Sequence, residues 1–325
     1  MMRPLVVPFL AALGLGGFAA LRCQRWIRDC TRRLEGGSTV IETPKGRVEY
    51  AISGAAGPAI LLVHGTPGGY DQGGLLAEVA ARHGFRLIAV SRPGYLRTPL
   101  EVGRTPAAQA DVFAALLDAL GISRAAVVGL SGGGPAAIQF ALRHPGRCLA
   151  LVVISAVSRP TVPRESFVAW LLSTRLFTSN PAGWLMGAAV KLRPALLVQA
   201  LEPSPELQAE ILSDPQKLSA LTAIAQAGIQ LPAQRRAGMR NDEEQFASLP
   251  VFRVETIRVP TLVIHGTADK NVPYAHGLFI AETVPGAELY AIKGGTHSIF
   301  VTHADQVFSR LFTFVGAHGT DTTVQ

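Results

Sequence analysis

A single serine in a glycine-rich turn offers the clearest chemistry in this sequence. Ser131 lies between Gly129 and Gly133 in the pattern Gly-x-Ser-x-Gly, after a β-branched apolar run and before an alanine-rich run. On such a strand-to-helix turn the serine backbone is strained, its hydroxyl is held out, and only small residues fit two positions to either side. The pattern therefore predicts a nucleophile, although a plain glycine-rich loop would carry the same letters.

A serine hydroxyl reacts only when a base removes its proton, and a third group must orient that base. His297 is the expected base because it lies in a loop directly after the last predicted strand; His303 is its nearest competitor. No Asp or Glu occurs between Ser131 and Glu165, so Asp269, just past the next predicted strand, is the expected acid. An Asx-type turn is the alternative role for Asp269.

The developing negative charge on the substrate oxygen needs backbone N–H donors. One is the amide of Gly132, directly after the predicted nucleophile. The other is expected from the turn His64-Gly65-Thr66-Pro67-Gly68-Gly69, which follows an apolar strand. Pro67 has no N–H, so Thr66 is the candidate donor.

Length and charge bound the class of protein. At 325 residues the chain is long enough for one large core with an insertion. The net charge of +7 is concentrated in residues 1–33, which hold six arginines and one aspartate, so the body is near neutral and shows no nucleic-acid footprint. The three cysteines form no disulfide framework, and no spacing indicates a metal or a cofactor.

Residues 4–21 form an uninterrupted apolar run, followed at once by an arginine-rich stretch. Its length is close to that of a bilayer-spanning helix, and the arginines after it predict a membrane anchor with the catalytic domain in the cytoplasm. Residues 4–33 would then contact the membrane. The alternatives are a signal peptide cleaved near residue 20, which would make the protein secreted or periplasmic, and an apolar arm packed on protein.

The remaining chain predicts an α/β fold, with a mostly parallel sheet, helices on both faces and an inserted helical cap. Residues 39–42 and 47–53 alternate apolar and polar side chains around a turn, which predicts a hairpin of edge strands. Strand and helix patterns then alternate to residue 157, stop, and resume at 259. We therefore divide the chain into residues 1–37 (anchor and basic linker), 38–157 (first part of the core), 158–258 (cap) and 259–325 (second part of the core).

These motifs resemble those of the α/β-hydrolase family over residues 38–317. The resemblance implies a catalytic triad of Ser131, Asp269 and His297, with an oxyanion hole from Thr66 and Gly132. In the segment Ser91-Arg92-Pro93-Gly94-Tyr95 the chain departs from the family's frequent Asp-x-Arg-Gly-x-Gly form, because a serine replaces the acid.

The predicted activity is hydrolysis of carboxylic esters, with lipophilic acyl groups, through an acyl-enzyme. A serine at the turn argues against epoxide hydrolases and haloalkane dehalogenases, which resemble this chain but use an aspartate there. The insert contains no tyrosine but is rich in large apolar residues, among which Trp170 and Trp184, together with Leu130 beside the nucleophile, are the expected substrate contacts.

Three alternatives stay open. One is an aminopeptidase similar to proline iminopeptidases, in which Glu202, Glu206 and Glu210 would bind the substrate amine. Another is a carbon–carbon bond hydrolase or a cofactor-free perhydrolase with the same triad. The third is a noncatalytic receptor or scaffold. The sequence does not define the oligomeric state.

Overall fold

The computed structural model describes residues 6–54, 57–161 and 178–318, and their centre is a sheet of eight strands in the order β1-β2-β4-β3-β5-β6-β7-β8. Strand β2 pairs antiparallel with β1 and with β4, and all other neighbours are parallel. The mostly parallel sheet that the sequence predicts is therefore confirmed. The strands are β1 (Thr39–Thr43), β2 (Gly46–Ser53), β3 (Ala59–Val63), β4 (Arg86–Val90), β5 (Ala125–Leu130), β6 (Cys148–Ile154), β7 (Thr261–Gly266) and β8 (Glu288–Ile292).

One expectation about the sheet is wrong. Both strands of the first hairpin were expected at the edge, but β2 lies inside the sheet, between β1 and β4. Its polar residue Glu49 is buried rather than solvated, because Ser38, Ser91 and Arg97 all donate hydrogen bonds to its carboxylate. The alternation of apolar and polar residues in β2 therefore does not mean that its polar side chains face solvent.

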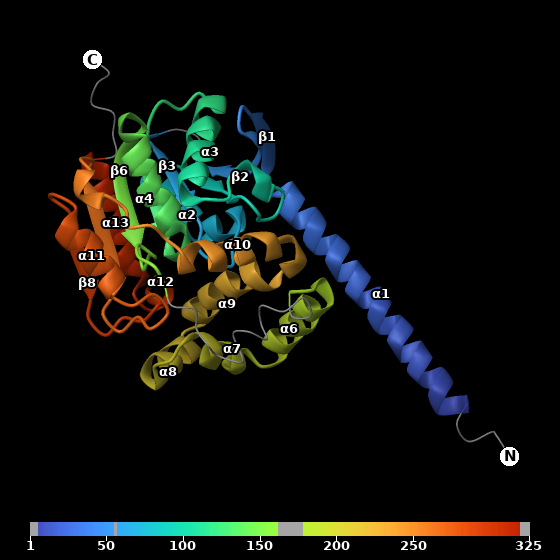
Figure 1. Ribbon diagram of the computed structural model, residues 1–325. Coiled ribbons are helices and arrows are strands. Elements are labelled where there is room, and N and C mark those ends of the chain that lie inside the picture. Colours follow the sequence, from blue (N-terminus) through green and yellow to red (C-terminus); the bar gives the residue numbers. More distant parts are fainter. Residues whose placement is uncertain (1–5, 55–56, 162–177, 319–325) are drawn as a thin grey trace.

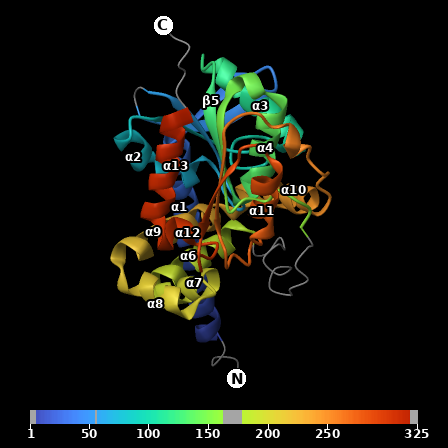
Figure 2. The same cartoon turned by 90° about the vertical axis from the view of Figure 1, so that its left-hand side faces the viewer.

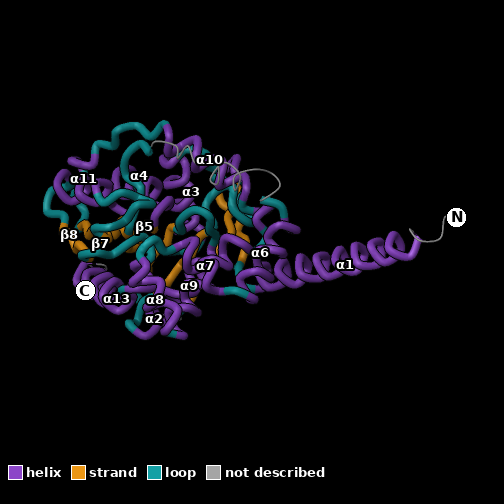
Figure 3. Tube along the Cα trace, turned by 90° about the horizontal axis from the view of Figure 1, so that it is seen from below, coloured by secondary structure: helices purple, strands orange, loops and turns teal. Residues whose placement is uncertain are grey.

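Helices cover both faces of the sheet, as Figures 2 and 3 show. The core helices are α1 (Val6–Gly36), α2 (Gly74–Arg82), α3 (Pro106–Ala119), α4 (Gly134–Arg143), α11 (Ala275–Thr283), α12 (Ile299–Thr302) and α13 (Ala304–His318). Apolar side chains of α3, α4 and α11 pack on one face, and those of α2, α13 and the end of α1 pack on the other. Two buried apolar layers thus hold the strand ends that carry the predicted site residues.

Between β6 and β7 the described chain is helical and forms the cap. Its helices are α6 (Asn180–Leu192), α7 (Pro194–Leu201), α8 (Pro205–Ser213), α9 (Pro215–Ile229) and α10 (Arg236–Ala247), gathered on one side of the sheet in Figure 1. Each of α6 to α9 has a proline in its first turn, where the missing N–H costs nothing. Side chains of Ser179, Ser204 and Asp214 cap three of these helices. These four prolines of the insert therefore start helices and do not interrupt them.

Helix α1 has two different parts. Toward its end, Cys30 and Leu34 are buried against the core, and the Tyr70 hydroxyl donates to the Leu34 carbonyl at 2.5 Å. Its first half extends away from the body (Figure 1), and the side chains of Phe18 and Leu21 are each 61% exposed.

Within the described helices, none alone combines the length and hydropathy required to cross a bilayer. Helices α6 and α7, bent by 107° at their junction, meet that criterion together, on length and composition only.

Candidate active site

Ser131 lies on the turn between β5 and α4 with φ of 45°, the left-handed region that non-glycine residues rarely adopt. A Cβ atom at Gly129 would lie 2.6 Å from the Ala137 Cβ, and one at Gly133 would lie 2.3 Å from the Val63 carbonyl oxygen. The expectation of a strained serine flanked by obligatory small residues is confirmed. Such a turn presents the hydroxyl above the end of the sheet.

Ser131, His297 and Asp269 are joined by hydrogen bonds although they come from three separate loops. His297 Nε2 lies 3.1 Å from Ser131 Oγ, and His297 Nδ1 lies 2.7 Å from Asp269 Oδ2. The Asp269 side chain is fully buried, whereas that of His297 is 24% exposed. With Nδ1–H donating to the carboxylate, Nε2 is the atom that accepts the serine proton.

The surroundings of Asp269 keep its carboxylate ionised. The amides of Asn271 and Val272 donate to its Oδ1 at 2.8 and 3.0 Å. Burial alone would raise the pKa of Asp269, but interactions with His265 and His297 outweigh it and hold that pKa well below its usual range. A permanent negative charge therefore faces His297.

The turn after β3, residues 64–69, meets the nucleophile turn through glycines on both sides. A Cβ atom at Gly65 would lie 3.1 Å from the Ser131 Cβ and 3.7 Å from its Oγ. A Cβ atom at Gly132 would lie 2.4 Å from Thr66 Oγ1 and 3.1 Å from Phe246 Cζ. The two predicted oxyanion residues are thus neighbours, and Gly132 has no room for any side chain.

His64 begins this turn and has a structural role. Its Nδ1–H donates to the Gly65 carbonyl at 2.7 Å, and its Nε2 accepts the Arg92 amide at 2.9 Å. Burial, together with the charge of Arg92, lowers the pKa of His64 well below its ordinary value. The ring is therefore neutral and of one tautomer, and it shapes the turn rather than taking part in proton transfer.

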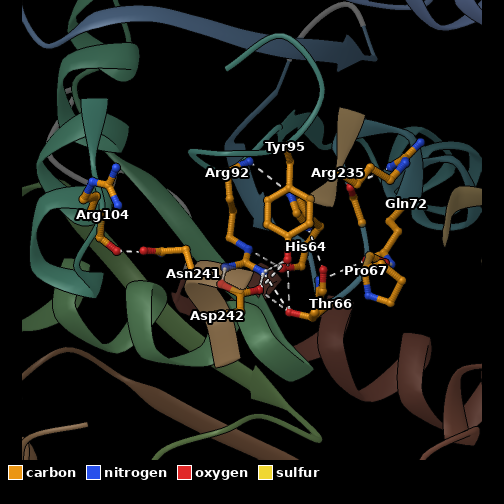
Figure 4. A network of polar contacts seen from close by, with 12 residues as sticks. His64, Thr66, Pro67, Gln72, Arg92, Tyr95, Arg104, Arg235, Asn241 and Asp242 are labelled. Atoms are coloured by element: carbon orange, nitrogen blue, oxygen red, sulfur yellow. Dashed lines mark hydrogen bonds and ion pairs between the residues drawn. The ribbon is translucent and has the colours of Figure 1, made fainter. Parts of the chain in front are cut away.

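Arg92, whose role the sequence left open, is the centre of a buried network (Figure 4). Its Nη1 and Nη2 donate to the two carboxylate oxygens of Asp242 at 2.8 and 2.5 Å, and these side chains are only 1% and 3% exposed. Nη2 also donates to Thr66 Oγ1 at 3.1 Å, the Thr66 hydroxyl donates to Asp242, and the Tyr95 hydroxyl donates to Asp242 at 2.5 Å. Asp242 belongs to cap helix α10, so the cap is bonded directly to the turn that carries Thr66.

Glycines allow α10 to come this close. The Gly238 amide donates to the Gly94 carbonyl at 2.8 Å. A Cβ atom at Gly238 would lie 2.2 Å from the Tyr95 ring, and one at Gly94 would lie 2.6 Å from the Gly238 nitrogen. Gly94 also has φ of 88°, which favours glycine. Backbone therefore meets backbone where the cap joins the core.

A second cap residue holds the other end of the same turn. Arg235 is fully buried; it donates to the Gly68 carbonyl at 2.6 Å and forms a bidentate ion pair with Asp71, with distances of 3.0 and 2.7 Å. At the core side of the turn, Gln72 donates to the Pro67 carbonyl at 2.7 Å (Figure 4). The turn is thus fixed from both the cap and the core.

The departure at Ser91 has a physical explanation. The carboxylate that the family's motif usually carries there comes instead from Glu49 of β2, which accepts the Ser91 hydroxyl at 2.8 Å. Ser91 Oγ also accepts the Tyr70 amide at 3.1 Å, and Arg97 pairs with Glu49 at 2.7 Å. A serine and a carboxylate on the neighbouring strand together hold this loop.

The expected substrate contacts are only partly placed. Leu130 is half-buried at the end of β5, directly before Ser131, and Trp184 is half-buried on α6. Trp170 lies outside the described residues, so its role stays a prediction, as does that of Trp184. Phe246 of α10 contacts the Gly132 position and was not predicted. Among the described residues, no group of three or more His, Cys, Asp and Glu side chains is arranged to hold a metal ion.

Comparison with known proteins decides the family. The family profile described as alpha/beta hydrolase fold matches residues 58–304. The chain belongs to the α/β-hydrolase family. An α/β-hydrolase fold protein from Nakamurella multipartita, of known structure, is 37% identical with a TM-score of 0.75, covering 86% of this chain and 99% of that one.

Two curated relatives match across most of their length. The uncharacterized hydrolase YcgS of Bacillus subtilis is 26% identical over 266 residues, covering 79% of this chain and 90% of that protein. The 2-hydroxy-6-oxononadienedioate/2-hydroxy-6-oxononatrienedioate hydrolase of Burkholderia vietnamiensis is 28% identical over 282 residues, covering 82% and 89%. This chain is therefore a hydrolase of the family, and its bond specificity must be argued from the site.

Proposed function

We propose that this protein is a serine hydrolase that cleaves carboxylic esters, with lipophilic acyl groups, through an acyl-enzyme on Ser131. The observation that carries the proposal is the chain of hydrogen bonds from Ser131 Oγ to His297 Nε2 at 3.1 Å and from His297 Nδ1 to Asp269 at 2.7 Å. This is the geometry that activates a serine hydroxyl.

In the first half of the reaction, Ser131 Oγ attacks the ester carbonyl carbon while His297 Nε2 takes the hydroxyl proton. The carbonyl oxygen becomes an oxyanion, which the amides of Thr66 and Gly132 stabilise. The bond to the alcohol oxygen then breaks, and His297 returns the proton to the leaving alcohol. Asp269 stays ionised and stabilises the imidazolium that forms between these steps.

In the second half, a water molecule attacks the acyl carbon of the ester formed on Ser131. His297 removes a proton from that water, the amides of Thr66 and Gly132 again stabilise the oxyanion, and the proton returns to Ser131 Oγ. The products are the free acid and the regenerated enzyme. No residue outside the two turns and the triad is required for proton transfer.

Of the three acids that an aminopeptidase could use for a substrate amine, Glu202 and Glu210 are bonded to other groups in this structure. Both carboxylate oxygens of Glu202 accept hydrogen bonds, from the Thr296 hydroxyl at 2.7 Å and from the Ser204 amide at 2.9 Å. Glu206 is exposed, and Glu210 forms an ion pair with a lysine of α9. The crowding at Gly132 also leaves no room for the aromatic residue that such aminopeptidases carry there. These contacts favour the ester hydrolase.

A carbon–carbon bond hydrolase is the second candidate, because the relative from Burkholderia vietnamiensis is named for such a substrate class. The same serine, histidine and aspartate would serve it. Assaying a 2-hydroxy-6-oxo-dienedioate beside p-nitrophenyl esters of increasing acyl length separates the two. Turnover of the dienedioate alone would replace the ester proposal.

The direct test of the mechanism is Ser131→Ala. We expect the variant to fold, to lose ester turnover and to lose labelling by a fluorophosphonate probe, which reacts only with an activated serine. An active variant would show that Ser131 is not the nucleophile, and a wild-type protein that fails to label would favour a noncatalytic role.

We further propose that the first half of α1 attaches the enzyme to a membrane, with residues 22–33 near the headgroups and the catalytic domain on the cytoplasmic side. Phe18 and Leu21 are exposed, and α1 contacts α6 of the cap. Figures 1 and 2 both show α6 and α7 on the side toward which α1 extends. The exposed apolar side chains there include Leu185, Leu192 and Leu196, and the basic residues Lys191 and Arg193 lie beside Leu192 in the sequence. Apolar surface beside arginine and lysine suits an anionic lipid surface.

Removing residues 1–21 tests this attachment, because Cys30 and Leu34 are part of the buried core and a cut near residue 36 would remove them. We expect the full chain to sediment with vesicles containing anionic lipid and the shortened chain to stay in the supernatant with unchanged esterase kcat. A full chain that stays in the supernatant contradicts the anchor. A mature N-terminus near residue 20 would identify a cleaved signal and reverse the compartment.

A further inference from the structure

The hydroxyl of Thr66 is the point at which the cap, the core and the nucleophile turn meet. It donates to Asp242 of α10, accepts Arg92 Nη2 at 3.1 Å, and lies 2.4 Å from the position of a Cβ atom at Gly132. Thr66 therefore has its hydroxyl in the cap network and lies against Gly132, the residue that follows Ser131.

We propose that Asp242 is a positioning residue: acting through Arg92 and the Thr66 hydroxyl, it holds the Thr66 amide where it donates to the oxyanion. This inference rests on the proposed ester hydrolysis and adds to it a role for the cap. Asp242 touches neither the substrate nor the reacting atoms, and its effect passes entirely through the turn.

The distribution of hydrogen bonds explains why this particular residue needs such support. Arg92 Nε holds the His64 carbonyl at 2.9 Å, and Gln72 holds the Gly65 amide at 2.9 Å and the Pro67 carbonyl at 2.7 Å. Between these points, the Thr66 hydroxyl is hydrogen-bonded to Arg92, Asp242 and Tyr95 of the buried network. A donor to an oxyanion must be placed to about 0.5 Å, so loss of these contacts misplaces the amide.

The buried charges of the network allow two possible roles of Asp242 to be distinguished by the direction in which kcat changes. Arg92 uses its guanidinium on Asp242, Thr66 and the His64 carbonyl, and Asp242 neutralises it. If Asp242 acted only as a counter-ion, its removal would leave a positive charge near the oxyanion and raise kcat. If it acts by positioning, its removal lowers kcat. The two roles therefore predict opposite changes.

The test uses full-length Asp242→Asn and Thr66→Val, with Glu244→Gln, an exposed residue of the same helix, as the matched control. Kinetics with a p-nitrophenyl ester give kcat and KM. A trifluoromethyl ketone with the same acyl chain gives Ki, because its hemiketal on Ser131 carries an oxyanion whereas the bound ester does not.

We expect Asp242→Asn to lower kcat about 10- to 100-fold, less than the 10²- to 10³-fold typical of deleting a donor, because the amide is displaced and not removed. Thr66→Val keeps the ion pair and the amide, so we expect about a 5- to 10-fold loss, below the same limit. In both variants KM changes less than about 3-fold, and Ki rises by the factor by which kcat/KM falls, as for an interaction made only in the transition state. The control stays within about 2-fold of the wild type.

Unchanged or increased kcat in Asp242→Asn overturns the proposal, and so does a fall in kcat with unchanged Ki. If circular dichroism shows that Asp242→Asn does not fold, Thr66→Val decides alone, and wild-type kcat and Ki in that variant reject the role. Failure of the proposed function looks different: the wild type would then neither hydrolyse esters nor bind the ketone.

Discussion

The two ends of the cap differ: one forms buried ion pairs with the core, and the other exposes apolar side chains. At its C-terminal end, Arg235 and Asp242 form buried ion pairs that reach the turn containing Thr66. At α6 and α7, by contrast, the side chains of Leu185, Leu192 and Leu196 are 59%, 82% and 55% exposed. Directional contacts fix geometry, whereas exposed apolar surface fixes none. The difference indicates that α10 belongs to the structure of the active site, whereas α6–α7 carries the exposed apolar surface for which membrane contact is proposed above.

The middle of the cap lies between these extremes. Glu202 at the end of α7 is buried and accepts the Thr296 hydroxyl, one residue before His297. Val198, Ile211, Leu221 and Val301 form a small apolar cluster that holds α7, α8 and α9 on α12. The cap therefore contacts the loop that carries His297 as well as the Thr66 turn. The contacts described at the His297 loop are a hydrogen bond and apolar packing, not a buried ion pair.

The largest expected effect concerns Arg92. Arg92→Met leaves Asp242 buried without its partner, so we expect the free energy of unfolding to fall by about 3–5 kcal/mol in urea denaturation. Replacing both residues, as in Arg92→Met with Asp242→Leu, should recover most of the stability but not kcat. A single variant as stable as wild type would show that the ion pair does not hold α10.

The entry of the chain into the cap should be sensitive to acid. The Ser158 amide donates to His276 Nδ1 at 3.1 Å, and burial, with the charge of His265, lowers the pKa of His276 from 6.5 to about 4. Below pH 6.5 the unfolded chain binds a proton that the folded chain refuses, so stability is full above that pH and falls as the pH drops toward 4. By linkage the loss reaches up to about 3 kcal/mol. In His276→Gln, the urea midpoint should depend less on pH over this range than in the wild type. An unchanged pH dependence would contradict the assignment.

Arg235→Ala should destabilise less than Arg92→Met. Its partner Asp71 has a side chain that is 18% exposed and can be hydrated when the arginine is gone. We expect a loss of about 1.5–3 kcal/mol in urea denaturation, the range for hydrogen bonds to charged groups. A loss equal to that of Arg92→Met would mean that exposure does not separate the two ion pairs.

The smallest effect on stability is expected at the other end of the cap. Leu192→Ser and Leu196→Ser should change the free energy of unfolding by about 0.5 kcal/mol or less, because both side chains are already exposed. The same variants should lower binding to vesicles with anionic lipid, measured by sedimentation. Strong destabilisation would show that these leucines are buried in solution. Unchanged vesicle binding would show that the cap does not contribute to membrane attachment.

The sequence located the residues whose signals are local. Ser131, Asp269 and His297 each follow the end of a strand, and the strands before them are mostly apolar, which the pattern reveals. Parallel strands end at one edge of a sheet, so the fold itself brings these three loops together. The sheet and the triad geometry could therefore be predicted.

The contacts of the cap could not be predicted, because no local pattern records them. Arg92 and Asp242 are 150 positions apart, and no pattern in the sequence pairs them. Glu49 lies in a strand that the pattern placed at the edge of the sheet, and its partners Ser38, Ser91 and Arg97 all lie outside that strand. Pairing over such distances depends on how the cap docks, which periodicity and composition do not specify.

The close approach of Gly94 and Gly238 sets a condition on exchanging caps between related hydrolases. The peptide connections near residues 158 and 258 look like the natural places to cut and join. The close contact between cap and core, however, lies at the first turn of α10, where a methyl group at 238 would lie 2.2 Å from the Tyr95 ring. A transplanted cap with any side chain at that position would stand off the core and carry its carboxylate out of reach of Arg92. Successful chimaeras of this enzyme should therefore inherit the glycine of the insert together with the loop that receives it.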